Sequence, residues 1–178
     1  EAARARAALA RLPAEYREIE KKEVVTRGEL AALAGVRLAD LLAGAPRRAG
    51  VVVTDVRGHW AAPWILPVVG AGLMDPYPNH TFQPDAPVNR GDLARLASRA
   101  LALVSRVDPK RYARWRAERP HFSDLPEHHV AYPAAAIAVA AGIVPPLEGG
   151  AFHLTRPVSG AEAAAAVDRL RELASKRR

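Results

Sequence analysis

The strongest constraint on the fold of this chain is a short segment that recurs three times, each time directly before an Ala/Leu-rich stretch. The copies share a valine, a small polar residue and a carboxylate three positions later: Val25-Thr26-Arg27-Gly28-Glu29, Val88-Asn89-Arg90-Gly91-Asp92 and Val158-Ser159-Gly160-Ala161-Glu162. Their starts lie 63 and 70 residues apart. Self-similarity at such spacings is typical of arrays of related supersecondary units. We therefore expect tandem units rather than one continuous, non-repetitive domain.

The second and third copies also match upstream of the recurring segment. The matching pairs are Asp55-Val56-Arg57-Gly58-His59-Trp60 with Asp124-Leu125-Pro126-Glu127-His128-His129, Ala71-Gly72-Leu73 with Ala141-Gly142-Ile143, and Thr81-Phe82 with Ala151-Phe152. A one-residue adjustment between Trp60 and Gly72 is expected to keep the two units in register. The first unit keeps only its second half. We predict a lead-in at 1–24, a partial unit at 25–50, a second unit at 51–105, a basic connector at 106–120, and a third unit with a basic tail at 121–178.

Charge and cysteine content limit the classes of partner. The net charge is 26 − 19 = +7, concentrated in residues 106–119 and 169–178, and the chain has no cysteine. A basic balance favours anionic partners such as nucleic acid, acidic lipid or acidic polysaccharide, although a solvated arginine-rich surface explains either patch equally well. The absence of cysteine excludes disulfides and fits either a reduced compartment or an envelope protein without them. Because the chain begins with Glu1 and not methionine, we expect it to be a piece of a longer protein.

Hydrophobic periodicity and breakers predict a mainly α protein with short helices and loops and little or no β structure. The uncharged run Val130–Leu147 has the length of a membrane span. It is alanine-rich and interrupted by prolines, so we interpret it as a buried helix. The other predicted helices cover 2–12, 26–34, 36–42, 59–72 and 89–105, with a further helix within 108–120.

The polar and acidic positions of the recurring segment are explained by helix capping. Thr26 and Glu29 have the spacing of a capping box, in which a hydroxyl and a carboxylate satisfy free N–H groups reciprocally. Asn89 with Asp92 is a looser version of the same pattern. An N-cap contributes about 1 kcal/mol of stability, so these residues need no further function.

Capping does not explain Arg27 and Arg90, which follow the cap residue in two of the copies. A cation in the first turn opposes the helix dipole, at a cost of roughly 0.3–1 kcal/mol when exposed. Free N–H groups at a helix start attract anions, and a guanidinium adds a forked donor for carboxylate or phosphate. The sequence therefore allows a ligand site at each arginine, or a pairing of each arginine with a carboxylate elsewhere, such as Asp55.

The second unit closely resembles the S-layer homology (SLH) motif. The residues that carry the resemblance are Thr54-Asp55-Val56, Gly58-His59-Trp60-Ala61, Ala71-Gly72-Leu73, Tyr77-Pro78, Thr81-Phe82-Gln83-Pro84-Asp85 and Val88-Asn89-Arg90-Gly91-Asp92. Thr26-Arg27-Gly28-Glu29 is similar to the family's Thr-Arg-Ala-Glu signature, and the third unit is a degenerate copy. Three such motifs usually form a pseudo-threefold domain with central helices and grooves between motifs.

The resemblance implies a function at the cell envelope. SLH grooves bind cell-wall polymer, often pyruvylated polysaccharide, and hold exported proteins on the surface, with the signature arginine contacting the anionic sugar. Carried over, this implies ligand-binding roles for Arg27 and Arg90. Asp55 and Trp60 stand at the family's Asp and Trp positions, and the cap residues Thr26 and Asn89 complete the expected site. We expect anionic wall polymer or peptidoglycan as partner, and a larger envelope protein around the module.

Departures from the family pattern leave an alternative open. The third unit has Gly160 where arginine is expected and His129 where Trp60 stands, so its groove should be weak or silent. The first unit lacks the half-motif with Asp and Gly-His-Trp, so Arg27 would sit in an incomplete groove. The alternative is a structural or protein-interaction module that no longer binds glycan.

Other candidate sites receive less support from the sequence. Trp60 and Trp64, four residues apart, favour core packing over a sugar platform, whereas Trp115 among arginines fits either a stacking platform or a covered connector helix. His128-His129 is too sparse for zinc. Catalytic motifs and phosphate loops are missing. We therefore expect no enzyme activity, metal or cofactor, and no nucleic-acid partner, since only charge supports one.

Overall fold

The computed structural model describes residues 10–106 and 108–175, and within them it is built of helices joined by loops. The lead-in holds α2 (Ala14–Glu18) and the 3-10 helix η1 (Ile19–Lys21), and the first unit holds α3 (Arg27–Arg37) and α4 (Ala39–Ala43). The second holds α5 (Ala62–Gly70) and α6 (Arg90–Val104). The connector forms α7 (Pro109–Ala117), and the third unit holds α8 (Tyr132–Ala140), the 3-10 turn η2 (Glu148–Gly150) and α9 (Gly160–Ser175).

The prediction of a mainly α fold is confirmed, since the described residues contain isolated β-bridges but no strand. The run at 130–147 contains the buried helix α8, as predicted. The helix predicted for 2–12 falls largely outside the described residues. Among those residues, no helix combines the length and the apolar character that crossing a membrane requires.

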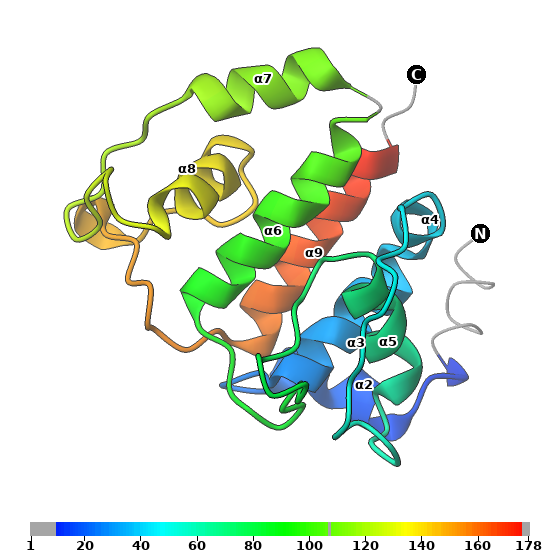
Figure 1. Ribbon diagram of the computed structural model, residues 1–178. Coiled ribbons are helices and arrows are strands. Elements are labelled where there is room, and N and C mark those ends of the chain that lie inside the picture. Colours follow the sequence, from blue (N-terminus) through cyan, green and yellow to red (C-terminus); the bar gives the residue numbers. More distant parts are fainter. Residues whose placement is uncertain (1–9, 107, 176–178) are drawn as a thin grey trace.

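Three helices that follow the recurring segment form the centre of the molecule. Helix α9 packs on both α3 and α6, while α5 covers α3 and α8 covers α6 (Figure 1). Helix α7 lies across α8 at the edge of the molecule, remote from α3 and α5 (Figure 1). The helices α3, α6 and α9 bury their Leu, Val and Ala faces, so the recurring Ala/Leu stretches are the core.

A closed ring of backbone hydrogen bonds joins the three units at their recurring valines. The amide of Val25 donates to the carbonyl of Val158 (2.9 Å), Val88 donates to Val25 (2.9 Å), and Val158 donates to Val88 (3.0 Å). All three valines are almost completely buried. Because each unit donates to one neighbour and accepts from the other, the arrangement has a pseudo-threefold axis through this ring.

Helix α5 begins three residues later than predicted, because a histidine turn precedes it. The His59 ring accepts the amide of Ala61 through Nδ1 (3.1 Å), and Ala62 N–H donates to the carbonyl of His59. His129 makes the same contact with the amide of Ala131 (3.1 Å). His129 is therefore the counterpart of His59, and our alignment of His129 with Trp60 was wrong. The one-residue adjustment lies before His59.

Candidate functional site

The guanidinium of Arg27 clamps the loop of the second unit. Its Nε donates to the carbonyl of Phe82 (2.8 Å) and its Nη2 to the carbonyl of Asp75 (2.7 Å). The guanidinium also lies 4.6 Å from the ring centroid of Phe82 and 4.8 Å from that of Tyr77. Arg27 is only 7% exposed. The first unit thus contributes its arginine to a groove whose loop comes from the second unit, and the missing half-motif of the first unit does not leave Arg27 without a loop.

Arg90 repeats this geometry between the second and third units. Its Nε donates to the carbonyl of Phe152 (2.7 Å) and its Nη2 to that of Pro145 (2.7 Å), each 70 residues beyond the partner of Arg27. Burial and the neighbouring Arg156 lower the pKa of Arg90, but an arginine stays protonated under such shifts. The recurring arginine is therefore a charged clamp that joins consecutive units.

The first-turn amides of these helices are occupied by the next unit. The amides of Arg27 and Gly28 donate to the carbonyls of Ala86 and Pro84, and those of Arg90 and Gly91 donate to Arg156 and Leu154. The third amide of each turn bonds its cap residue, Thr26 or Asn89, and both capping boxes are complete. The expectation that free N–H groups at the helix start attract an anion is therefore wrong.

Asp55 shapes the loop and does not pair with the arginines. Its two oxygens accept the amides of Phe82 (2.6 Å) and Gln83 (2.7 Å). Asp124 accepts the amides of Phe152 and His153 in the same way, both at 2.7 Å. Each aspartate thus holds the phenylalanine whose carbonyl the arginine clamp uses. The suggested pairing of Arg27 or Arg90 with Asp55 was wrong, because backbone amides occupy that carboxylate.

These contacts predict a loss of stability in acid. Burial alone would raise the pKa of Asp124, but the amides of Phe152 and His153 outweigh it and hold the pKa below its usual range. A carboxylate with a depressed pKa stabilises the fold above its unfolded pKa of about 4 and loses that effect as the pH falls through its folded pKa. We expect the urea midpoint to fall between about pH 6 and pH 3, and to fall less in Asp124→Asn.

The matched control for this prediction is Glu23→Gln, because Glu23 is an exposed carboxylate. It should show the same acid response as the wild type. If Asp124→Asn and the wild type lose equal stability over this pH range, the Asp124 contacts do not contribute as described.

The third position of the pseudo-threefold set is closed. A Cβ atom on Gly160 would lie 1.7 Å from the carbonyl oxygen of Ile19, and the amide of Gly160 donates to the carbonyl of Lys22 (2.8 Å). The 3-10 helix η1 therefore occupies the place that a clamp arginine would need. This explains why residue 160 is glycine. The groove that we expected to be weak or silent is occupied by η1.

A groove of about 200 Å³ opens beside the Arg27 clamp. We call it the first groove; it is formed by residues 73–78 of the loop and by one face of α6. Its polar residues are Arg27, Asp75, Tyr77, Asp92, Arg95 and Arg99. Three arginines and two aspartates give it a net charge of 3 − 2 = +1. Tyr77 is 39% exposed there, so its ring is accessible to a ligand.

Asp75 is held by two cations in the first groove. Its carboxylate accepts from Arg48 (2.6 Å) and from Arg99. Burial alone would raise the pKa of Asp75, but these two hydrogen bonds outweigh it and keep the pKa below its usual range. Asp75 stays ionised at neutral pH and positions the side chain of Arg99 along the groove.

The corresponding place beside Arg90 has lost most of these groups. Proline stands at 145 for Asp75, leucine at 147 for Tyr77, and alanine at 165 for Arg95. Arg169 remains as the counterpart of Arg99, but its Nη1 donates to the carbonyl of Gly142 (3.0 Å). The second position therefore keeps the structural clamp and loses the aromatic ring and a cation.

The structure brings one of the six predicted site residues, Arg27, into the first groove. Arg90 forms the second clamp, Thr26 and Asn89 cap helices, and Asp55 holds the loop. Trp60 is half-buried, with its ring centroid 6.1 Å from that of Trp64 in an edge-to-face pair. Sequence reasoning missed Asp75, Arg95 and Arg99. Arg95 and Arg99 lie four residues apart and therefore share one face of α6, so this helical spacing was the available signal.

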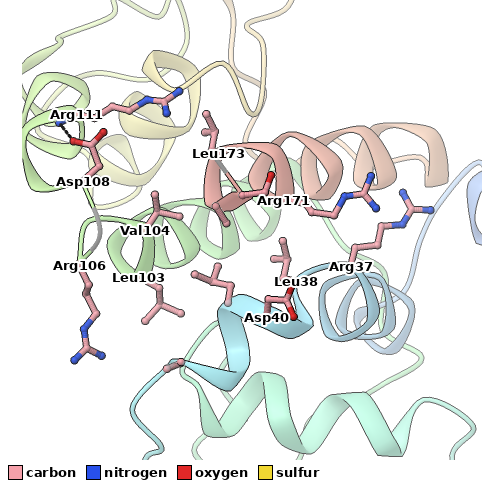
Figure 2. Close-up of a pocket in the computed structure, with 15 residues that line it drawn as sticks. Arg37, Leu38, Asp40, Leu103, Val104, Arg106, Asp108, Arg111, Arg171 and Leu173 are labelled. Atoms are coloured by element: carbon pink, nitrogen blue, oxygen red, sulfur yellow. Dashed lines mark hydrogen bonds between the residues drawn. The ribbon is translucent and has the colours of Figure 1, made fainter. Parts of the chain in front are cut away.

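A cavity larger than the first groove lies at the opposite ends of the central helices. It measures about 710 Å³, and Leu38, Val104 and Leu173 are among its apolar residues (Figure 2). Arg37 and Arg171 at its edge both pair with Asp168. None of the six predicted residues lines the cavity. In the described part of the chain, no cluster of His, Asp and Glu could hold a metal ion.

Comparisons with known proteins agree with this geometry. Residues 54–94 and 121–164 each match the family model of the S-layer homology domain. A stretch of 47 residues is 38% identical to a cellulosome-anchoring protein of Acetivibrio thermocellus, and it covers 26% of this chain and 10% of that protein. Both matched segments contain the loop aspartate and the loop phenylalanine of the clamp. The second and third units of this chain are S-layer homology domains.

Proposed function

We propose that this chain is a non-catalytic module that attaches a larger exported protein to the bacterial cell envelope. We further propose that the first groove binds an anionic wall polymer, such as pyruvylated polysaccharide or peptidoglycan. Support comes from the family match of two units and from the anchoring role in the name of the similar protein. The observation that carries the proposal is the juxtaposition of Tyr77 with Arg95 and Arg99 in one groove.

The chemistry of the first groove suits an acidic sugar. The exposed Tyr77 ring offers an apolar face for a pyranose, with a hydroxyl at its edge. The Arg95 side chain is 57% exposed, with its Nη1 3.6 Å from the Asp92 carboxylate, and the other N–H groups of its guanidinium can bind a ligand carboxylate. Arg27 uses Nε and Nη2 for the loop, so we assign it a positioning role with a positive charge behind the site. Binding at one groove is weak, and a polymer reaches useful strength through several modules.

We also infer that the first unit, residues 25–50, is a partial motif of the same family, which brings the number of motifs to three. The support is their Thr26-Glu29 capping box, their clamp arginine and their place in the valine ring. In this proposal η1 closes the groove that the first unit would otherwise share with the third. The module then has a single functional groove and two structural positions.

The test is co-sedimentation with purified cell-wall sacculi, before and after extraction of the attached acidic polymer. We expect the wild type to sediment with untreated sacculi; loss of sedimentation after extraction identifies the attached acidic polymer as the ligand, and retained sedimentation identifies peptidoglycan. Tyr77→Ala and Arg95→Ala should weaken binding by roughly tenfold, as truncation of a central aromatic or arginine contact does. The measured quantity is the bound fraction as a function of sacculus concentration.

The third unit supplies matched controls. Leu147→Ala and Arg169→Ala alter the positions equivalent to Tyr77 and Arg99, and both should bind like the wild type. Equal binding by the wild type and the first-groove variants would overturn this site. Absence of sedimentation of the wild type with untreated sacculi would favour the second candidate function.

The second candidate is an SLH-derived structural module that packs against another protein domain. The observation in its favour is the burial of Arg27 and Arg90, which are 7% and 2% exposed and bonded within the chain. Under this candidate the arginines hold the three units together and need no glycan.

A further inference from the structure

A second cleft, separate from the first groove, lies between α7 and α8. It has a volume of about 480 Å³, within the range of small-molecule sites. One wall is α7 with the residues that follow it, the other is the start of the third unit, and Ser98 of α6 contributes at the base. Helix α7 contains no buried residue. It packs through half-buried side chains only, and Figure 1 shows it lying across α8.

Two aromatic rings of α7 border this α7–α8 cleft. Tyr112 and Trp115 both line it, and both are half-buried. The guanidinium of Arg111 lies 4.9 Å from the Trp115 ring centroid. Arg111 borders the large cavity near Leu173 and not this cleft (Figure 2). Arg111 therefore lies over the indole without lining the cleft, whereas Trp115 itself lines the cleft.

The polar groups around these rings are balanced in charge. Arg116 and Arg119 are opposed by Glu118 and Glu127, which gives a net charge of 2 − 2 = 0. Arg119 already donates to the carbonyl of Arg116 (3.0 Å). Guanidinium donors and carboxylate acceptors thus balance one another among the residues that line the cleft, and the other cations of α7, Lys110, Arg111 and Arg114, lie outside that lining. Such a set suits a neutral ligand with many hydroxyl or amide groups and one apolar face.

The geometry points to the α7–α8 cleft as a second binding site that takes a neutral pyranose unit. The apolar C–H face of the sugar stacks on Trp115, and its hydroxyl or acetamido groups bond Arg116 and Glu127. A nucleobase also stacks on an indole, but nucleic-acid sites depend on excess positive charge. This site is independent of the first groove, which carries a positive charge and suits an acidic sugar.

The test is an NMR titration with N,N′-diacetylchitobiose, a neutral amino-sugar disaccharide, with adenosine monophosphate as the comparison ligand. The chain has three tryptophans and hence three indole N–H resonances. Trp115→Phe identifies the Trp115 resonance by its disappearance. We expect saturable shifts of that resonance and of the α7 amides with the disaccharide, and no saturable shift with the nucleotide.

Two variants separate binding from folding. Trp115→Ala removes the platform, and Glu127→Ala removes a polar group from the opposite wall without touching α7; each should weaken binding by roughly tenfold. A thermal unfolding midpoint equal to that of the wild type shows that each variant is folded. Arg95→Ala in the first groove should leave the titration unchanged. The proposal fails if the disaccharide gives no saturable shift, if only the nucleotide does, or if Glu127→Ala binds like the wild type.

Discussion

Gly160→Ala is expected to destabilise the protein by about 3 kcal/mol or more, although it replaces a glycine in the first turn of a helix with the best helix former. The added Cβ would meet the carbonyl oxygen of Ile19 at 1.7 Å and its carbon at 2.7 Å. Neither is the flexible end of a side chain, so η1 or the start of α9 must move. The measurement is thermal unfolding, in which this loss corresponds to a midpoint about 10 °C lower.

The matched control is Gly70→Ala at the end of α5, where a new Cβ has no heavy atom within 4 Å. That substitution should be neutral or should stabilise by up to about 1 kcal/mol, because it gains helix propensity without a clash. Equal midpoints for Gly160→Ala and the wild type would show that η1 does not press on Gly160 in solution.

The contact between residue 160 and the carbonyl of Ile19 also predicts a result opposite to the one that comparison with the family suggests. Gly160→Arg restores the arginine of the SLH signature, yet it should destabilise at least as much as Gly160→Ala. The loop that a clamp arginine needs is replaced in this interface by η1, whose residues precede the first unit. Restoring the signature therefore creates no third groove.

Local chemistry made the helix starts predictable from the sequence. Thr26 with Glu29 and Asn89 with Asp92 form complete capping boxes, because the groups that bond are three residues apart. The Asn89–Asp92 pair, which matches the capping-box pattern less closely, forms as complete a box as Thr26–Glu29. The buried helix α8 (Tyr132–Ala140) within the run at 130–147 was likewise predictable, with Pro133 in its first turn, but it ends before Gly142, at φ 69°, and not at Pro145.

The candidate site was only partly predictable, because its contacts join distant parts of the chain. Arg27 was singled out correctly as unusual in a first helical turn, but the carbonyls that bind it lie 48 and 55 residues away. No local sequence pattern shows that the backbone carbonyls of Phe82 and Asp75 will accept their hydrogen bonds from a distant arginine. The misplaced register adjustment has a similar cause. His59 and His129 correspond because each ring accepts a backbone amide two residues later, and a comparison of residue types does not show this hydrogen bond.

The burial of the clamp arginines also changes how binding experiments must be read. A variant of Arg27 that loses wall binding loses the loop that shapes the first groove as well. Tyr77 and Arg95 are therefore the informative positions for the ligand, and the arginines of the signature are informative for the architecture. This separation follows from exposure, since the side chains of Arg95 and Arg90 are 57% and 3% exposed on the same helix.

Arg90→Ala is expected to cost about 4 kcal/mol of unfolding free energy, because hydrogen bonds to a charged donor contribute about 1.5–3 kcal/mol each and two are lost. The carbonyls of Phe152 and Pro145 lose their donor. A cavity also forms beside the Phe152 ring, which lies 4.8 Å from the guanidinium. Urea unfolding followed by tryptophan fluorescence measures the loss.

Arg90→Lys should recover only part of this stability, because an ammonium group lacks the planar fork that reaches two separate carbonyls. Arg95→Ala on the exposed face of α6 is the matched control, and we expect it to change the unfolding free energy by less than about 0.5 kcal/mol. If Arg90→Ala unfolds within 1 kcal/mol of the wild type, the clamp does not hold the second and third units together. That result would favour the role that the family resemblance implies, in which the recurring arginine contacts the ligand.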